Sequence, residues 1–270
     1  MWFLLKLALA ALCTCLLLVL VAYFGQRKLI YFPDRTRVPP GELGLAGVEE
    51  RVLRTPDGER LVAWYAKAKP GEPTLLYFHG NGGGLRERAD RIRQFTGEGW
   101  GVYMMAYRGY AGSTGAPTET ANVADARLAY GALLLEGVAP EAVIAYGESL
   151  GTNVAARIAV ERRVGGLILE APYTSIAELG SQIHPYLPVD LLLIDRYETD
   201  KVIAQVKGPI LVIHGARDRT VPVGMGREIA GLANEPKQLV ILPNAGHNNL
   251  YLDGNDAIAV VRNWLRTLAR

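Results

Sequence analysis

The sequence predicts an α/β protein with a mostly parallel eight-stranded sheet, helices on both faces of that sheet, and an N-terminal transmembrane helix. Short, continuously apolar runs alternate with helix-patterned segments over most of the chain, which is typical of buried parallel strands joined by crossover helices. A long apolar stretch without charges precedes them. With 270 residues and 50% hydrophobic content, the chain suits one such domain with an appendage.

The apolar stretch runs from Leu7 to Phe24 without a charged residue. About 18 apolar residues suffice for a helix to span a bilayer. We therefore predict a membrane anchor over residues 1–26, followed by a proline- and glycine-rich connector over residues 27–47. A cleaved signal peptide is the alternative, but the stretch is longer than a usual signal core and no small-x-small cleavage site follows it.

Residues on either side of the anchor indicate how it would lie in a membrane. Aromatic residues suited to an interfacial belt follow the span at Tyr23, Phe24, Tyr31 and Phe32. Only Lys6 precedes the span, whereas several basic residues follow it, namely Arg27, Lys28, Arg35 and Arg37. The positive-inside rule therefore favours a cytoplasmic location for the large C-terminal part.

After the connector, the strand-like segments 48–54 and 61–67 flank a turn-forming Pro56-Asp57-Gly58, which predicts an antiparallel hairpin. Short apolar runs follow at 75–78, 102–106, 143–146, 167–169, 210–213 and 239–242. Helix-patterned segments lie near 85–95, 120–135, 150–162, 223–233 and 256–268. This alternation predicts one domain over residues 48–270, with its ligand site beyond the carboxyl ends of the strands.

The segment Gly147-Glu148-Ser149-Leu150-Gly151 directly follows an apolar run and directly precedes a helix-patterned segment. It predicts a strand, a sharp turn and a helix, with Ser149 exposed at the turn. The two glycines would let the strand and the helix pass close together, because they lack side chains. Ser149 is therefore the candidate nucleophile.

Serine needs an adjacent base to become a good nucleophile, and the base needs a third group to fix its tautomer. His247 lies in the loop after the last predicted strand, and Asp218 follows the strand before it. We predict Ser149, Asp218 and His247 as the catalytic residues. Asp195 and Asp200 are rival acids, but they lie in an inserted segment and are expected to be solvated.

The remaining histidines have simpler expected roles. His79 and His214 each close an apolar run before a glycine, a position at which a ring most often makes structural hydrogen bonds. His184 lies in the inserted segment. Arg108 and Tyr110 also follow a strand, but we expect an ion pair for the arginine and packing for the tyrosine rather than catalytic roles.

The chain order Ser, Asp, His is that of the α/β-hydrolases, and the sequence resembles that superfamily from about Val48 to its C-terminus. With its anchor, it is similar to the membrane-anchored α/β-hydrolase domain-containing serine hydrolases. The motifs that carry the resemblance are His79-Gly80-Asn81-Gly82, Tyr107-Arg108-Gly109-Tyr110, Gly147-Glu148-Ser149-Leu150-Gly151 and Gly246-His247. The resemblance implies hydrolysis of acyl esters or thioesters by a carboxylesterase, lysophospholipase or acyl-thioesterase, without a cofactor.

A serine hydrolase also needs preorganised donors for the oxyanion that forms during the reaction. The backbone amide of Leu150 is expected to be one donor, because it follows the nucleophile at a helix N-terminus. The resemblance points to the backbone amide of Asn81 as the second donor, with Gly82 as the alternative. Glu148, next to the nucleophile, is expected to orient neighbouring groups.

Residues 171–208 are longer than a crossover requires and form a predicted cap-like insertion. It contains an apolar cluster of Ile183, Tyr186, Leu187, Val189, Leu191, Leu192, Leu193 and Ile194. This cluster fits either a short cap that lines an acyl pocket or the core-facing flank of a helix, because apolar periodicity does not separate the two.

Charge and cysteine content exclude several classes of function. A net charge of +2 without a basic stripe argues against nucleic-acid binding. The only cysteines, Cys13 and Cys15, lie in the predicted anchor, so we expect no cysteine-based metal site and no metal cofactor. The sequence predicts a membrane-anchored serine hydrolase with a small-molecule, lipid or acyl-protein substrate. A serine peptidase of the same fold and a catalytically silent scaffold are the alternatives.

Overall fold

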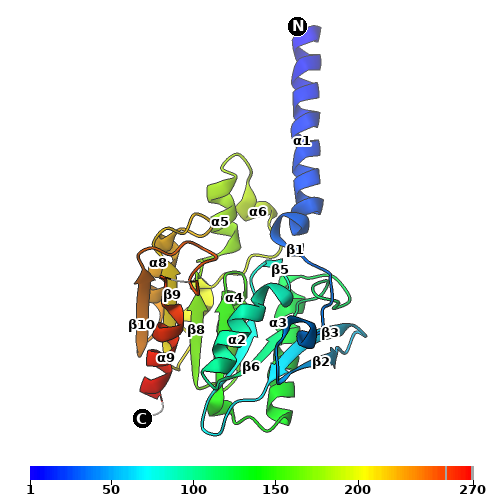
Figure 1. Ribbon diagram of the computed structural model, residues 1–270. Coiled ribbons are helices and arrows are strands. Elements are labelled where there is room, and N and C mark those ends of the chain that lie inside the picture. The colour runs from blue at the N-terminus through cyan, green and yellow to red at the C-terminus, as the bar shows by residue number, and fades with distance from the viewer. Residues whose placement is uncertain (253, 269–270) are drawn as a thin grey trace.

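The computed structural model describes residues 1–252 and 254–268. Its main sheet has eight strands in the order β10-β9-β8-β7-β4-β6-β3-β2 (Figure 1). Their bounds are β2 Val48–Arg54, β3 Arg60–Ala66, β4 Thr74–Phe78, β6 Gly101–Met105, β7 Val143–Glu148, β8 Gly166–Glu170, β9 Ile210–Gly215 and β10 Lys237–Leu242. A second sheet pairs two short strands, β1 Phe32–Pro33 and β5 Gly82–Gly83.

The sheet is mostly parallel, as predicted. Strands β10, β9, β8, β7, β4 and β6 run parallel to one another. Only the hairpin strands β2 and β3 are antiparallel, both to each other and where β3 meets β6. The expected hairpin and the six apolar runs are therefore confirmed as strands. Every residue of β4, β6, β8 and β9 is buried, which is why these runs lack the alternation of half-exposed strands.

Helices lie on both faces of this sheet (Figure 1). The longer ones that follow the hairpin are α2 Ala89–Gly97, α3 Glu119–Leu135, α4 Gly151–Glu161, α8 Val223–Leu232 and α9 Ala257–Leu268. Helix α4 contacts the strands β7 and β8 and the helix α3. An ion pair between Arg262 of α9 and Glu98, which caps α2, ties those two helices together. The predicted helical segments are confirmed.

The N-terminal helix α1 extends over Trp2–Ile30, with helical structure continuing past residue 26 into the expected connector. It projects away from the sheet and most of its side chains are exposed (Figure 1). Its length and composition are sufficient to cross a bilayer. A helix that is apolar all round and uncovered by protein matches the composition of a membrane span.

The insertion after β8 folds into the short helices α5 Ile176–Ile183, α6 Val189–Leu192 and α7 Asp200–Ile203. Helices α5 and α6 lie on the same side of the sheet as the base of α1 (Figure 1). Gln26 of α1 donates a hydrogen bond to the Leu192 carbonyl and accepts one from the Ile194 amide. The end of the apolar helix is thus joined directly to the insertion.

Two sequence-based expectations fail at this joint. Asp195, expected to be solvated, is only 3% exposed and accepts hydrogen bonds from the Arg27 guanidinium and the Tyr31 hydroxyl. Tyr31, expected in an interfacial belt, is buried, and its hydroxyl also lies 2.9 Å from that of Tyr197. Both errors arise because α1 packs against an element far away in the chain.

Candidate active site

Ser149 lies at the sharp turn between β7 and α4, at the carboxyl end of the parallel strands. Its φ is +48°, a conformation that non-glycine residues rarely adopt. Both neighbouring glycines are required: an added Cβ would lie 2.4 Å from the Gly151 carbonyl oxygen at Gly147, and 2.1 Å from the Phe78 carbonyl oxygen at Gly151. The predicted strand-turn-helix geometry is therefore present, with the backbone strain located at the serine.

The structure brings Ser149, His247 and Asp218 into one hydrogen-bonded chain. His247 Nε2 lies 3.0 Å from Ser149 Oγ, and His247 Nδ1 lies 2.7 Å from Asp218 Oδ2. Because the aspartate accepts from Nδ1–H, the Nε2 lone pair faces the serine hydroxyl. The loops after β9 and β10 supply the acid and the imidazole.

The Asp218 carboxylate is fully buried but well supplied with donors. Its Oδ1 accepts the Thr220 and Val221 amides at 2.8 Å, and His214 Nε2 lies 3.3 Å from Oδ2. Burial by itself raises the pKa of Asp218, but hydrogen bonds from His214 and His247 outweigh it and hold the pKa well below its usual value. The carboxylate thus stays charged in a buried position.

His79 has the structural role expected of it. Its Nδ1 lies 2.7 Å from the Gly80 carbonyl oxygen, and its Nε2 accepts the Tyr107 amide. Burial lowers the pKa of His79 to about 3, so the ring is neutral at pH 7. His214 has more than the structural role expected for it, because its ring also contacts Asp218. The sequence offers one signal for this contact, since His214 precedes Asp218 by four residues.

The amides of Leu150 and Asn81 are both positioned near the serine. Leu150 is the N-cap residue of α4, and Asn81 lies in the loop after β4 and lines the same cavity as Ser149 and His247. Within residues 1–252 and 254–268, neither amide has a hydrogen-bond acceptor. The lack of an intramolecular partner agrees with the expected roles of these N–H groups as oxyanion donors, which stay a prediction.

The loop that carries Asn81 is held by contacts from two other elements. The Asn81 side-chain amide donates to the carbonyl of Ile30, the last residue of α1. The Asn81 carbonyl accepts hydrogen bonds from the Phe32 amide at 3.0 Å and the Tyr110 hydroxyl at 2.7 Å. The end of the apolar helix and the fully buried Tyr110 therefore fix the position of this loop.

Residues 70–196 match the family described as serine aminopeptidase, S33. The uncharacterized protein Rv2307c of Mycobacterium tuberculosis is 38% identical over 255 residues, which cover 93% of this chain and 91% of that protein. The α/β hydrolase domain-containing protein WAV2 of Arabidopsis thaliana is 29% identical over 266 residues, covering 88% and 85% of the two chains. The chain belongs to the α/β-hydrolase superfamily.

Two further comparisons agree with a hydrolase. The lysophosphatidylserine lipase ABHD12 of Danio rerio is 31% identical over 199 residues, covering 65% of this chain and 51% of that protein. The esterase Pf2001 of Pyrococcus furiosus has the same fold, with a TM-score of 0.68, 20% identity, and coverage of 88% of this chain and 97% of that one. The expected α/β-hydrolase fold is thus confirmed.

In this α/β-hydrolase, Glu148 belongs to a buried ionic cluster beside the nucleophile. Arg88 binds both of its carboxylate oxygens, at 2.7 and 3.1 Å, while Arg91 and the Tyr77 hydroxyl contact the second oxygen. Arg88 also donates to the carbonyls of Gly82 and Gly84. Glu148 thereby links the serine turn to the loop that carries Asn81, an orienting role that sequence reasoning anticipated without its partners.

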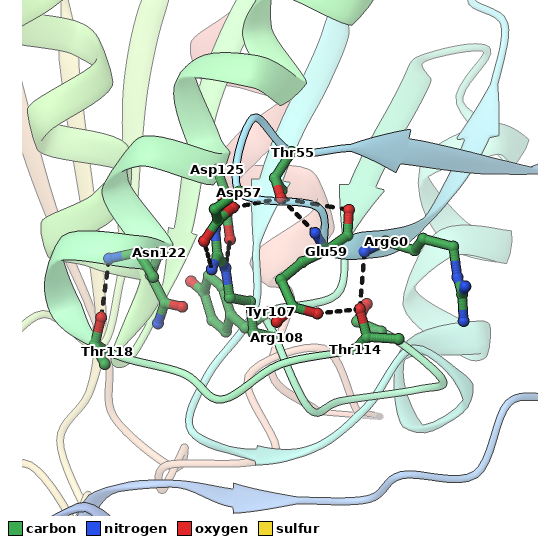
Figure 2. Close-up of polar contacts among 12 residues, drawn as sticks. Thr55, Asp57, Glu59, Arg60, Tyr107, Arg108, Thr114, Thr118, Asn122 and Asp125 are labelled. Carbon is green, nitrogen blue, oxygen red and sulfur yellow. Dashed lines mark hydrogen bonds and ion pairs between the residues drawn. The ribbon is translucent and has the colours of Figure 1, made fainter.

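Arg108 lies outside the site and joins two surface elements of the hydrolase (Figure 2). Its guanidinium contacts both oxygens of Asp125 in α3, at 2.8 and 2.9 Å, and also binds Asp57 in the β2–β3 turn. Because these carboxylates occupy the guanidinium, Arg108 stabilises the packing of the hairpin on α3. The ion pair expected for Arg108 is therefore present.

Two cavities near Ser149 share the lining residues Asn81 and Thr220. A polar cavity of about 410 Å³ is lined by Ser149, His247, Arg88 and Arg91, among others. An apolar cavity of about 280 Å³ lies between the end of α1 and the insertion. Within the described residues there is no group of three His, Cys, Asp or Glu side chains arranged to hold a metal ion.

Proposed function

We propose that this α/β-hydrolase is a membrane-anchored serine hydrolase that cleaves carboxylic ester or thioester bonds in lipid or acylated substrates. The main support is the hydrogen-bonded chain from Ser149 through His247 to Asp218, with the Leu150 and Asn81 amides beside it. These are a nucleophile, a base, an orienting acid and two oxyanion donors, which together are what acyl transfer requires.

The proposed reaction proceeds through an acyl-enzyme. Ser149 Oγ attacks the substrate carbonyl carbon while His247 Nε2 takes the hydroxyl proton, and the carbonyl oxygen becomes an oxyanion held by the amides of Leu150 and Asn81. Collapse of this intermediate breaks the bond to the leaving group, which receives the proton from His247. Water then attacks the acyl-enzyme with His247 as base, which releases the acid and restores Ser149.

The buried charge of Asp218 supports the base in this cycle. The aspartate holds Nδ1–H and stabilises the imidazolium that forms when His247 accepts the serine proton. Since Asp218 is ionised over the whole neutral range, this support does not titrate near pH 7.

An ester or thioester substrate agrees with the surroundings of the serine. The adjoining apolar cavity offers space for an acyl chain, and a relative of this chain is named as a lysophosphatidylserine lipase. Anchoring by α1 would keep the site close to amphiphilic substrates in a bilayer and raise their local concentration.

A peptidase is the second candidate, because the matching family is described as serine aminopeptidase. An aminopeptidase site needs a free carboxylate to bind the substrate ammonium group. The two glutamates that line the polar cavity are already engaged: Glu148 binds Arg88, and Glu87 binds the Gly84 amide and Arg86. This arrangement favours an ester substrate over an N-terminal peptide.

Labelling with a fluorophosphonate probe tests for an activated serine. We expect the wild-type protein to be labelled, Ser149→Ala to remain unlabelled, and Asp218→Asn to react far more slowly. For hydrolysis of p-nitrophenyl esters, Asp218→Asn should lower kcat by roughly ten thousandfold, because the imidazole adopts the wrong tautomer. A folded wild-type protein that neither reacts with the probe nor hydrolyses esters would instead favour a silent scaffold, and cleavage of aminoacyl p-nitroanilides alone would favour a peptidase.

A further inference from the structure

The apolar cavity beside the serine has walls from two distant parts of the chain. One wall is formed by the last turns of α1, including Ala22, Leu29 and Ile30, and the other by the insertion, including Leu179 and Leu187. Ala22, Gln26 and Ile30 are four residues apart, so they share one face of the helix. The cavity exists only because that face of α1 packs against the insertion.

This apolar cavity adjoins the polar cavity of the proposed catalytic centre. Asn81 and Thr220 line both the apolar cavity and the polar cavity that contains Ser149 and His247. A chain bonded to a carbonyl carbon at Ser149 Oγ would therefore pass Asn81 and Thr220 and enter the space between α1 and the insertion. Beyond that point the lining is apolar except for Gln26 and His184, which suits a hydrocarbon chain.

The α1 wall of the cavity contains one amide side chain, Gln26, which has a structural role. Gln26 donates to the carbonyls of Tyr23 and Leu192 and accepts the Ile194 amide at 2.7 Å. Its polar atoms are thus satisfied by α1 and the insertion. The arrangement fixes the distance between the two walls and leaves the space between them apolar.

The insertion also carries apolar side chains that are exposed. The tip of the insertion exposes three large apolar side chains, Ile183, Tyr186 and Leu191, with exposures of 59%, 95% and 85%. This tip lies next to the base of α1 (Figure 1). With α1 in a bilayer, the tip would lie at the headgroup and acyl boundary, where exposed apolar side chains are stabilised.

We propose that the apolar cavity is the acyl-chain subsite and that the anchor helix α1 is one of its walls, so that the chain of a membrane-resident substrate enters from the bilayer between α1 and the insertion. The inference rests on the proposed function and makes it more specific. The substrate class is a long-chain acyl ester or thioester whose acyl chain remains in an apolar environment as its carbonyl reaches Ser149. Helix α1 then determines chain-length preference as well as location.

Substitutions that fill the cavity test this role of α1. We would assay the full chain in detergent micelles on p-nitrophenyl esters from acetate to palmitate, comparing Ala22→Trp with Ala11→Trp. Both changes add the same side chain to α1, but Ala11 is exposed and far from the cavity. Leu187→Trp fills the cavity from the insertion and provides a second variant if the first is poorly folded.

The expected readout is the ratio of kcat/KM for palmitate to that for acetate. Each methylene that loses its apolar contact costs roughly a fourfold factor, so exclusion of three or four methylenes should lower the ratio by about a hundredfold. We expect this loss in Ala22→Trp and Leu187→Trp, and an unchanged ratio in Ala11→Trp.

The outcomes separate this inference from the proposed function. If the wild-type protein hydrolyses esters through Ser149 but both filling variants keep the wild-type ratio, or lose activity equally for all chain lengths, the chain does not occupy this cavity and the inference is wrong. If the wild-type protein hydrolyses no ester of the series and its serine does not react with a fluorophosphonate, the proposed function itself fails.

Discussion

At Glu148, two arginines and a tyrosine converge on one largely buried carboxylate. Burial favours the neutral acid, but the charges of Arg88 and Arg91 outweigh it and hold the pKa of Glu148 well below its usual value. The same Arg88 holds the carbonyls of Gly82 and Gly84. One ion pair thus connects the serine turn to the loop of the proposed oxyanion donor.

This ion pair predicts a particular dependence of stability on pH. Because the folded-state pKa of Glu148 is depressed, its stabilising contribution is fully present above the unfolded value of about 4.3 and is lost as the pH falls towards the folded value. Glu148→Gln should therefore lower the free energy of unfolding by about 3 kcal/mol at pH 7. The gap between the two proteins should narrow below pH 4.

Thermal unfolding of both proteins in detergent between pH 3.5 and 8 measures this gap. Glu141→Gln serves as the control, since Glu141 forms an exposed pair with Arg163 and should change stability little at any pH. A gap between wild type and Glu148→Gln that stays constant across the range would mean that the ionised carboxylate is not the stabilising species.

The residues of the proposed triad could be chosen from sequence because their positions follow from the chain order of strands and loops. The supporting residues could not. Arg88 reaches Glu148 across 60 positions in the chain, and the Tyr110 hydroxyl reaches the Asn81 carbonyl across 29. Arg88 and Tyr110 belong to no recognisable sequence motif for these roles, so only the packing of the loops identifies them as supporting residues.

Among the contacts between elements, those that join α1 to the insertion matter most for the proposed site. Asp195 is the centre of that joint, because Arg27 and Tyr31 both donate to it. Sequence reasoning treated Asp195 as solvated, since it lies in a segment without a strand pattern. The carboxylate can be buried there because α1 and the residue that follows it, Tyr31, supply two hydrogen-bond donors.

Asp195→Ala should loosen the insertion without unfolding the sheet. Removing this acceptor leaves two donors without their partner, at a cost of about 1–3 kcal/mol. We expect faster hydrogen exchange in residues 176–194, measured by mass spectrometry, with little change in β4 and β7. Asp190→Ala is the matched control, because Asp190 is exposed and its carboxylate pairs with the nearby Arg196, its one ionic partner among the described residues. Equal protection of residues 176–194 from hydrogen exchange in the two variants would show that Asp195 does not hold the insertion against α1.

If α1 spans a membrane, the domain that follows it lies on one defined side of that membrane. Basic residues beyond the span predict a cytoplasmic domain. The cysteines of the chain, Cys13 and Cys15, both lie in α1. A cysteine introduced elsewhere can therefore report the location of the domain, because thiols within a bilayer are shielded from aqueous reagents.

Leu135→Cys provides such a reporter, since Leu135 is 91% exposed. A membrane-impermeant maleimide should label this variant only after the cells are lysed, and should leave wild type unlabelled in membranes. Labelling of Leu135→Cys in intact cells would place the domain on the opposite face. Recovery of the protein in the soluble fraction would contradict the anchor.

The sequence by itself determined the sheet, the long apolar helix and the candidate triad, because strand burial, span length and the Gly147-to-Gly151 turn each leave a local pattern in the residues. The position of the insertion beside α1 follows only from the tertiary structure. Its apolar residues fit a cap or a core-facing helix equally well in the sequence, and its role as a cap stays a prediction. Contacts between Gln26, Asp195 and the insertion form across more than 160 residues, and no local pattern records an interaction between such distant segments.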